Sequence, residues 1–203
     1  MSNKELIEPI IKQYYDSFIL KLDNRNEENN DRDILMNLYD ISPDLKRENR
    51  QYWGRELGML WQLIVTELAK THCADFQPAL FIGRDEICDL RIGKDAIDTK
   101  YRVGSGDSGT LKKLKDYGRI LKEKGYNPVL LFVRNDNLPS AITAANTGGW
   151  EIYTDKNSFS YLDNKIGVNI IDLLSSFSNK YYIADFVREA AIKYRKNQNQ
   201  RYG

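Results

Sequence analysis

The stretch Glu86 to Arg102, EICDLRIGKDAIDTKYR, decides the fold of this chain. Its centre, Gly93-Lys94, predicts a two-residue turn of the glycine-first type that pairs Ile92 with Asp95. Apolar and polar residues alternate along much of both arms, which is typical of strands with one buried and one polar face. The stretch therefore predicts an antiparallel hairpin with a defined register.

Two aspartates share the polar face of this hairpin. In the register that the turn sets, Asp89 is expected directly opposite Asp98, with their β-carbons about 5 Å apart. A slip of one residue in the turn leaves both on the same face. The charged face carries Asp89, Arg91, Asp98, Lys100 and Arg102. The opposite face carries the residues expected in the core, Cys88, Leu90, Ile92, Ile97, Thr99, Tyr101 and Val103.

Opposed carboxylates repel each other unless a positive charge lies between them. Mg²⁺ favours a few carboxylates plus waters, which leaves positions for phosphate oxygens and an attacking water. Lys100 is placed to orient or deprotonate that water, or to neutralise phosphate charge. The hairpin thus predicts metal-assisted phosphodiester hydrolysis. The alternative is a solvated face on which Asp98–Lys100 and Asp89–Arg91 are surface ion pairs.

Composition narrows the class of protein. The chain has 203 residues, 41% hydrophobic and 29% charged, with a formal net charge of +1, so any basic surface must be local. No apolar run has the length of a membrane span, and the N-terminus does not resemble a secretory signal. Cys73, Cys88 and the single His72 provide neither a disulfide framework nor a zinc set. We expect a reduced, cytoplasmic protein whose metal, if any, is bound by oxygen ligands.

Around the hairpin, the chain predicts one α/β domain, 1–203. Residues 1–70 are expected to form a mainly helical flank, 78–155 the catalytic core and 156–203 the C-terminal helices. An amphipathic helix is expected over 3–22, followed by a polar loop to 33. The further predicted helices are 34–39, 43–70, 110–124, 139–146, 170–177 and 183–196. The predicted strands are 79–82, 87–92, 96–103, 129–133 and 150–153.

Asp89, followed by Asp98-Thr99-Lys100 behind the apolar Ala96-Ile97, resembles the PD-(D/E)xK nuclease superfamily. The resemblance implies a restriction-endonuclease-like α/β (α+β) core, with a mixed central sheet flanked by helices. It further implies that Asp89, Asp98 and the Thr99 carbonyl bind Mg²⁺, and that Lys100 is the catalytic lysine. Size and polar segments are most similar to a type II restriction endonuclease, which as a homodimer cuts double-stranded DNA at a specific site and leaves 5′-phosphates.

A further acidic ligand from the preceding helix occurs in some members of the superfamily. The candidates here are Glu56, which we prefer, and Glu67. Asp85 or Glu86 could instead be the first acid of the motif, but Glu86 has the wrong parity for the catalytic face if its strand is regular. The chain also departs from the pattern at Cys88, where proline is usual, and in the short gap between its two aspartates.

The loop Gly104 to Gly109 matches G-x-G-x-x-G between a strand and a helix. A dinucleotide site is disfavoured because the preceding strand is charged and Asp107 would face the pyrophosphate, so no nicotinamide cofactor is expected. In a nuclease, the loop and helix start would bind a DNA phosphate, with Ser108 or Thr110 as the cap. The predicted backbone contacts are Arg102, Ser105, Ser108, Lys112 and Lys113. The alternative for the lysines is a solvated helix face.

Arg134, Asn135 and Asn137 follow the most apolar predicted strand. Arginine and asparagine can bind guanine and adenine in the major groove, so these residues are candidates for reading bases. Asp136-Asn137 could equally cap the next helix. Two other functions stay open: a repair or junction-resolving nuclease of the same superfamily, and a non-enzymatic protein that binds DNA or a nucleotide through the glycine loop.

Overall fold

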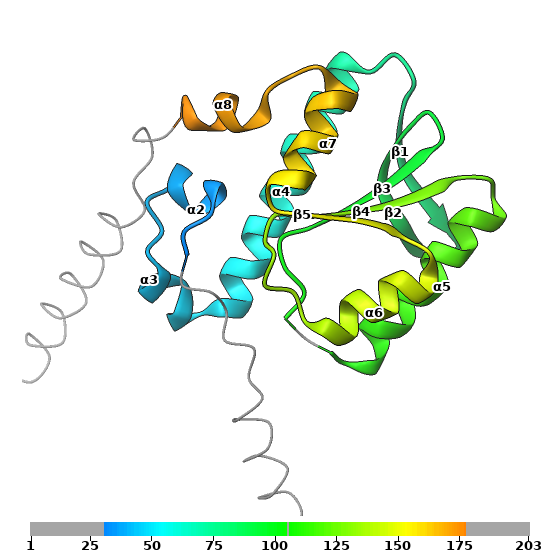
Figure 1. Cartoon of the computed structure of the whole chain (residues 1–203), viewed down its shortest axis with the longest axis horizontal. Helices are drawn as coiled ribbons and strands as arrows, with labels where there is room; N and C mark the ends of the chain where they lie inside the picture. Colours follow the sequence, from blue (N-terminus) through cyan, green and yellow to red (C-terminus); the bar gives the residue numbers. More distant parts are fainter. Residues whose placement is uncertain (1–30, 105, 178–203) are drawn as a thin grey trace, which may run out of the picture.

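The structure is a computed structural model that describes residues 31–104 and 106–177. Its centre is a five-stranded mixed sheet in the order β1-β2-β3-β4-β5 (Figure 1). The strands are β1 (Phe76–Ile82), β2 (Asp85–Ile92), β3 (Asp95–Lys100), β4 (Asn127–Phe132) and β5 (Glu151–Thr154). β1, β2 and β3 form an antiparallel meander, whereas β4 runs parallel to β3 and β5 parallel to β4.

Helices cover both faces of this sheet (Figure 1). One face packs against α4 (Arg50–His72) and α7 (Lys156–Ile166), and the other against α5 (Ser108–Glu123) and α6 (Pro139–Gly148). We call the two hydrophobic clusters the α4–α7 core and the α5–α6 core. Short helices α2 (Ile34–Leu38), α3 (Pro43–Glu48) and α8 (Ile170–Ser175) extend the α4–α7 core.

β4 shows why the sheet has two cores. Val129 and Leu131 belong to the α4–α7 core, whereas Leu130 and Phe132 belong to the α5–α6 core, and all four are buried. A parallel strand covered by helices on both faces has a continuous apolar sequence, because its successive side chains enter the two cores alternately. Val129 to Phe132 of β4 form such a strand, and Val133 directly after it is buried in the α4–α7 core.

α5 and α6 pack closely through two glycines. A β-carbon on Gly118 would lie 2.5 Å from the Gly148 carbonyl oxygen, and one on Gly148 would lie 2.5 Å from that of Leu114. The Trp150 indole N–H donates to the Leu114 carbonyl at 2.7 Å and fixes the end of α6 to α5. This packing positions the start of α5 at the end of the sheet where β3 and β4 finish.

The predicted class, an α/β fold with a mixed sheet flanked by helices and a helical N-terminal part, is confirmed. The hairpin register is also confirmed, since Ile92 pairs with Asp95 and Gly93 has the positive φ (58°) that a glycine-first turn requires. No helix in the described part of the chain is long and apolar enough to cross a membrane. The helices predicted over 3–22 and 183–196 lie outside the described residues.

Some predicted bounds were wrong. The helix expected over 43–70 is divided into α3 and α4 because Asn49 leaves the helical conformation (φ −147°, ψ 70°) and caps α4 through a bond from the Tyr52 N–H. β1 begins at Phe76 rather than 79, and β3 ends at Lys100 rather than 103. α7 falls in the expected C-terminal helical part, although the helices predicted there begin only at residue 170.

Candidate active site

The predicted carboxylates lie where β2 and β3 stop pairing. The ladder between the two strands extends from Ile92–Asp95 to Leu90–Ile97. At the next position Asp89 is buried, and its Oδ2 accepts hydrogen bonds from both the backbone N–H and the hydroxyl of Thr99, each at 2.6 Å. A side chain of β2 therefore takes the place of a backbone partner for β3, and Asp89 is fixed beside Asp98.

Asp98 and Lys100 form the second half of the site. The Lys100 ammonium lies 2.8 Å from Asp98 Oδ1 and donates to the Thr99 carbonyl at 3.3 Å. Burial and the neighbouring Asp89 carboxylate raise the pKa of Asp98 to about 7, although Lys100 opposes this shift. Burial lowers the pKa of Lys100, but the charges of Asp98 and Asp89 outweigh it and raise that pKa. The ammonium is therefore the cation that balances the two carboxylates.

A β-bulge adds Glu86 to this cluster. β1 pairs Leu80 with Cys88 but the next residue, Phe81, with Glu86, so Ile87 is an extra residue in β2. As a result Ile87 and Cys88, although consecutive, both enter the α5–α6 core. For the residues of β2 that precede Ile87, this extra residue exchanges the two faces of the strand on which successive side chains lie.

Glu86 consequently lies on the side of Asp89, within hydrogen-bonding reach of its carboxylate. The Gln62 amide of α4 donates to Glu86 Oε1 at 3.3 Å. Burial first, and then Asp89, raise the pKa of Glu86, whereas Lys100 and Gln62 lower it. The argument from parity against Glu86 required a regular strand, and the bulge removes that condition. The adjacent apolar pair Ile87-Cys88, which breaks the alternation, is the sequence signal for the bulge.

The other acidic candidates have partners elsewhere. Glu56 is exposed and bonded to Arg55 at 2.9 Å, and it lies six residues from Gln62, about 120° away around α4. Glu67 is exposed on α4 and 3.5 Å from Lys70. The structure therefore favours Glu86, not Glu56, as the acidic neighbour of Asp89.

A divalent cation at this site would depend on few protein ligands. In residues 31–104 and 106–177, no group of three or more histidine, cysteine or acidic side chains is arranged to hold a metal ion. The donors that the hairpin does bring together are the carboxylates of Asp89 and Asp98 and the Thr99 carbonyl oxygen. These are hard oxygen donors, of the kind and small number that suit Mg²⁺, which keeps several waters. The Lys100 ammonium contacts two of these donors, the Asp98 carboxylate and the Thr99 carbonyl oxygen.

The start of α5 differs from the prediction. Its N-cap is Asp107, whose carboxylate accepts from the N–H of Thr110 at 2.9 Å and from its hydroxyl at 2.7 Å, so neither Ser108 nor Thr110 is the cap. A capping carboxylate accepts from a free N–H group at the positive N-terminal end of the helix, and its negative charge disfavours a second anion there. Ser108 is the first, exposed residue of α5, and Ser105 lies outside the described residues.

Lys112 and Lys113 are exposed in the first two turns of α5. The Lys113 ammonium lies 3.9 Å from Asp85, at the beginning of β2. The two lysines are therefore presented to solvent near the β1–β2 turn, which is compatible with phosphate contacts.

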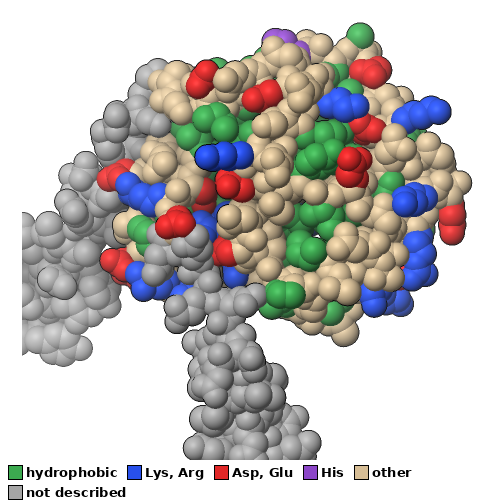
Figure 2. Space-filling view, viewed as in Figure 1, with side chains coloured by type: hydrophobic (Ala, Val, Ile, Leu, Met, Phe, Trp, Pro, Cys, Tyr) green, Lys and Arg blue, Asp and Glu red, His purple; other side chains and the backbone are tan. Residues whose placement is uncertain are grey.

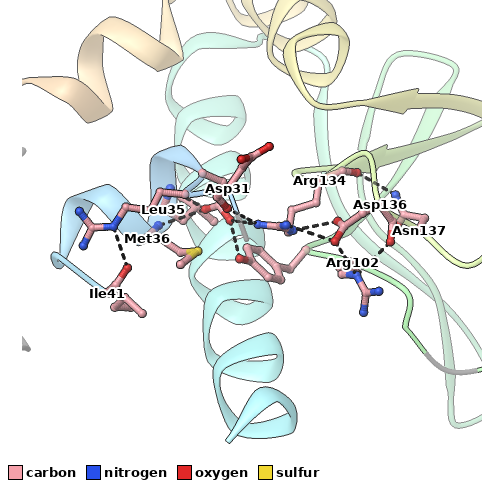
Figure 3. Close-up of polar contacts among 11 residues, drawn as sticks. Asp31, Leu35, Met36, Ile41, Arg102, Arg134, Asp136 and Asn137 are labelled. Atoms are coloured by element: carbon pink, nitrogen blue, oxygen red, sulfur yellow. Dashed lines mark hydrogen bonds and ion pairs between the residues drawn. The ribbon is translucent and has the colours of Figure 1, made fainter. Parts of the chain in front are cut away.

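Arg134 is buried in an internal network rather than presented to solvent (Figure 3). Its guanidinium donates to Asp136 at 2.8 and 3.1 Å, to Asp33 at 3.0 Å and to the Asp31 carbonyl at 3.0 Å. The Tyr101 hydroxyl donates to the same Asp33 carboxylate at 2.5 Å. These bonds join the N-terminal flank to the ends of β3 and β4.

Asn137 and Arg102 complete this network (Figure 3). Asn137 is buried, accepts from the Val103 N–H at 2.9 Å and donates to the Arg134 carbonyl at 2.7 Å. Arg102 Nε donates to the Asp136 carbonyl at 3.0 Å. Arg134 and Asn137 thus hold the backbone together, and their burial counts against the expectation that they read bases. Asn135, in contrast, is exposed. Nor does Asn137 cap α6, whose N-cap is Leu138.

Comparison of the chain with known protein families, with curated proteins and with solved structures finds no match. Inferences about function therefore depend on the geometry of the site.

Proposed function

We propose that this chain is a magnesium-dependent nuclease that hydrolyses phosphodiesters of double-stranded DNA, and specifically a type II restriction endonuclease. The observation that carries the proposal is the convergence of Asp89, Asp98 and Lys100 where β2 and β3 separate. Two adjacent carboxylates, of which Asp89 is buried and Asp98 largely so, are costly to a fold unless they have a use or a counterion. A solvated surface hairpin, the simpler interpretation, does not require Asp89 to be buried.

In this proposal, Asp89, Asp98 and the Thr99 carbonyl hold Mg²⁺, which supplies positive charge at the phosphate and acidifies water. Thr99 keeps the Asp89 carboxylate in one orientation through its two hydrogen bonds. Lys100 orients the attacking water and neutralises charge that develops on the phosphate. The water oxygen bonds to phosphorus as the bond from phosphorus to the 3′ oxygen breaks. The products are a 5′-phosphate and a 3′-hydroxyl.

DNA would lie across the end of the sheet that carries the start of α5. Lys112 and Lys113 are the proposed contacts to the phosphate backbone, and Asn135 is the predicted base contact that remains exposed. Arg102 lies against Gly104, where a β-carbon would be 2.2 Å from Arg102 Nη1, so it shapes the loop as well as adding charge. A homodimer that acts on a palindromic site in the cytoplasm is part of the same proposal.

A repair or junction-resolving nuclease with the same catalytic residues is the second candidate. The Asp89–Asp98–Lys100 cluster favours it equally, because the cluster performs the cleavage without selecting the DNA. A nucleotide-binding protein that uses the glycine loop is less well supported, since Asp107 occupies the cap of α5.

Incubation of the purified full chain with phage DNA, with and without Mg²⁺, tests the proposal. Discrete magnesium-dependent fragments are expected. A smear would support a nuclease that cuts without sequence specificity and would reject a restriction endonuclease. Asp98→Asn should abolish cleavage and keep DNA binding, whereas Asp44→Asn, at an exposed ion pair of α3, should cleave normally. Intact DNA with Mg²⁺ and with Mn²⁺, from a protein shown to be folded, would reject the nuclease.

A further inference from the structure

An apolar groove lies on the side of α4 that faces away from the candidate active site. Its volume is about 450 Å³, and α2, α4 and α8 contribute its walls. Figure 2 shows hydrophobic side chains exposed at the surface between α2 and α8. The lining is apolar apart from Glu67 and the Tyr39 hydroxyl, and consists of Leu38, Tyr39, Leu60, Ile64, Glu67, Leu68, Leu173, Leu174 and Phe177.

Exposed hydrophobic side chains continue from this groove along α4. Met59 is 52% exposed, Leu63 60% and Tyr52 44%, and Phe177 at the groove is 40% exposed. Tyr52, Met59 and Leu63 are seven and four residues apart, so they form one row on the outward side of the helix. Apart from them, the large exposed hydrophobics of the described residues are Phe81 and Ile82, beside the β1–β2 turn. An apolar row beside an apolar groove indicates a surface that a partner covers.

Residues 3–22 of the same chain have the properties of that partner. Their apolar residues recur at helical spacing and form a broad stripe: Leu6, Ile7, Ile10, Ile11, Tyr14, Phe18 and Leu22. A helix of this length is about 30 Å long, and the α4 surface from Tyr52 to Leu68 extends over about 24 Å. The segment is therefore long enough to cover both the row and the groove.

The connection to the described residues allows the segment to reach this surface. Asp31 is held through its carbonyl by Arg134, and Asp33 caps α2, whose C-terminal end lines the groove. Residues 23–30 can span up to about 28 Å when extended. A tether this short gives an effective concentration in the millimolar range, which favours docking within one chain over docking between two chains.

Residues 183–196 fit the groove less well. Three of their apolar residues are small alanines (Ala184, Ala190 and Ala191), and the chain from 193 onward is basic, with Lys193, Arg195, Lys196 and Arg201 and no acid. Such a segment is better suited to solvent or phosphate than to an apolar groove. We propose that residues 3–22 dock as an amphipathic helix along α4 of their own chain and cover the groove between α2, α4 and α8.

Cysteine cross-linking in the full chain tests this proposal. The background carries Cys73→Ser, because Cys73 is partly exposed, and keeps Cys88, which is buried. Ile10→Cys is combined with Leu63→Cys or with Met59→Cys, and a short bis-maleimide is added. The control pairs Ile10→Cys with Lys112→Cys on α5, across the sheet. We expect an intramolecular cross-link with either α4 position, formed at least about tenfold faster than in the control.

Cross-links between two chains would overturn the proposal in favour of a second copy as the occupant, and equal rates in test and control pairs would also overturn it. A second measurement leaves α4 intact. Ile10→Asp with Ile11→Asp should increase binding of a hydrophobic dye several-fold by uncovering the groove, whereas Lys12→Asp should not. Unchanged dye binding in the double variant would likewise reject the docked helix.

Discussion

Asp89 of β2 binds Thr99 of β3 twice, through the backbone N–H and through the hydroxyl, at 2.6 Å each. The side chain thus replaces a rung of the ladder just after the Leu90–Ile97 pair. Because Asp89 is held by the strand that carries Asp98 and Lys100, the two halves of the candidate site cannot separate without breaking these bonds. This relationship makes the hairpin itself the support of the site.

Thr99→Val is predicted to destabilise the protein. The substitution keeps the shape of the side chain but removes the hydroxyl that donates a hydrogen bond to Asp89. Hydrogen bonds to charged groups are worth about 1.5–3 kcal/mol, so the free energy of unfolding should fall by roughly that amount. Urea unfolding measures it. Thr143→Val, at an exposed threonine that bonds to the Pro139 carbonyl of its own helix, should cost less than about 0.5 kcal/mol. Equal effects at the two positions would contradict the role of Thr99.

Glu86→Gln is predicted to weaken the response to Mg²⁺ because Glu86 adds negative charge and a hydrogen-bonding carboxyl beside Asp89. Changes next to metal ligands typically cost about tenfold or more in affinity, so the half-saturating Mg²⁺ concentration for cleavage should rise roughly tenfold. Asp85→Asn is the matched control, since Asp85 is its exposed neighbour near Lys113. If both variants behave as the unaltered protein, Glu86 has no part in the site.

The raised pKa of Asp98, about 7 against an ordinary 3.8, predicts how stability depends on pH without metal. Between these values the folded protein holds a proton that the unfolded chain releases, so this group makes the folded state less stable as the pH rises from 4 to 7. Asp98→Asn has no carboxyl group at this position, so it neither binds nor releases this proton. The difference in unfolding free energy between the unaltered protein and Asp98→Asn should therefore fall across that range. A flat difference would show that Asp98 is ionised throughout.

Gly118→Ala is predicted to destabilise the packing of α5 on α6, because the new methyl group would lie 2.5 Å from the Gly148 carbonyl oxygen. Overpacking of this kind costs about 1–3 kcal/mol and should lower the Tm. Gly54→Ala in α4 is the control, since nothing lies within 4 Å of its β-carbon. It should raise stability by about 0.5–1 kcal/mol through helix propensity. Scanning calorimetry of both variants measures the Tm. An unchanged Tm in Gly118→Ala would contradict the prediction.

Lys112→Glu with Lys113→Glu is predicted to weaken DNA binding at every sequence alike, because both side chains are exposed at the start of α5. The salt dependence of binding should become shallower by about one unit of slope for each DNA phosphate that the variant no longer neutralises. Fluorescence anisotropy with labelled duplexes at several salt concentrations measures both quantities. Lys94→Glu, in the turn at the other end of β3, should leave both unchanged. An unchanged slope in the double variant would place the DNA elsewhere.

Local sequence determined the central hairpin and the fold class. Gly93-Lys94 sets the register, since a two-residue turn admits only one set of partners, and the apolar run Val129 to Val133 identifies a strand buried on both faces. Those features depend on residues close together in the chain. For the same reason, Asp89, Asp98 and Lys100 could be assigned to one place before any tertiary contact was known.

Only the tertiary structure decided which other side chains join them. The bulge at Ile87 depends on pairing with β1 and on two consecutive side chains entering the α5–α6 core, and it moves Glu86 toward Asp89. Arg134 is buried because Asp33, distant in sequence, lies against the end of β4. Alternation along a strand predicts a side chain's direction only while pairing is regular, and the burial of a polar residue depends on partners that the local sequence does not specify.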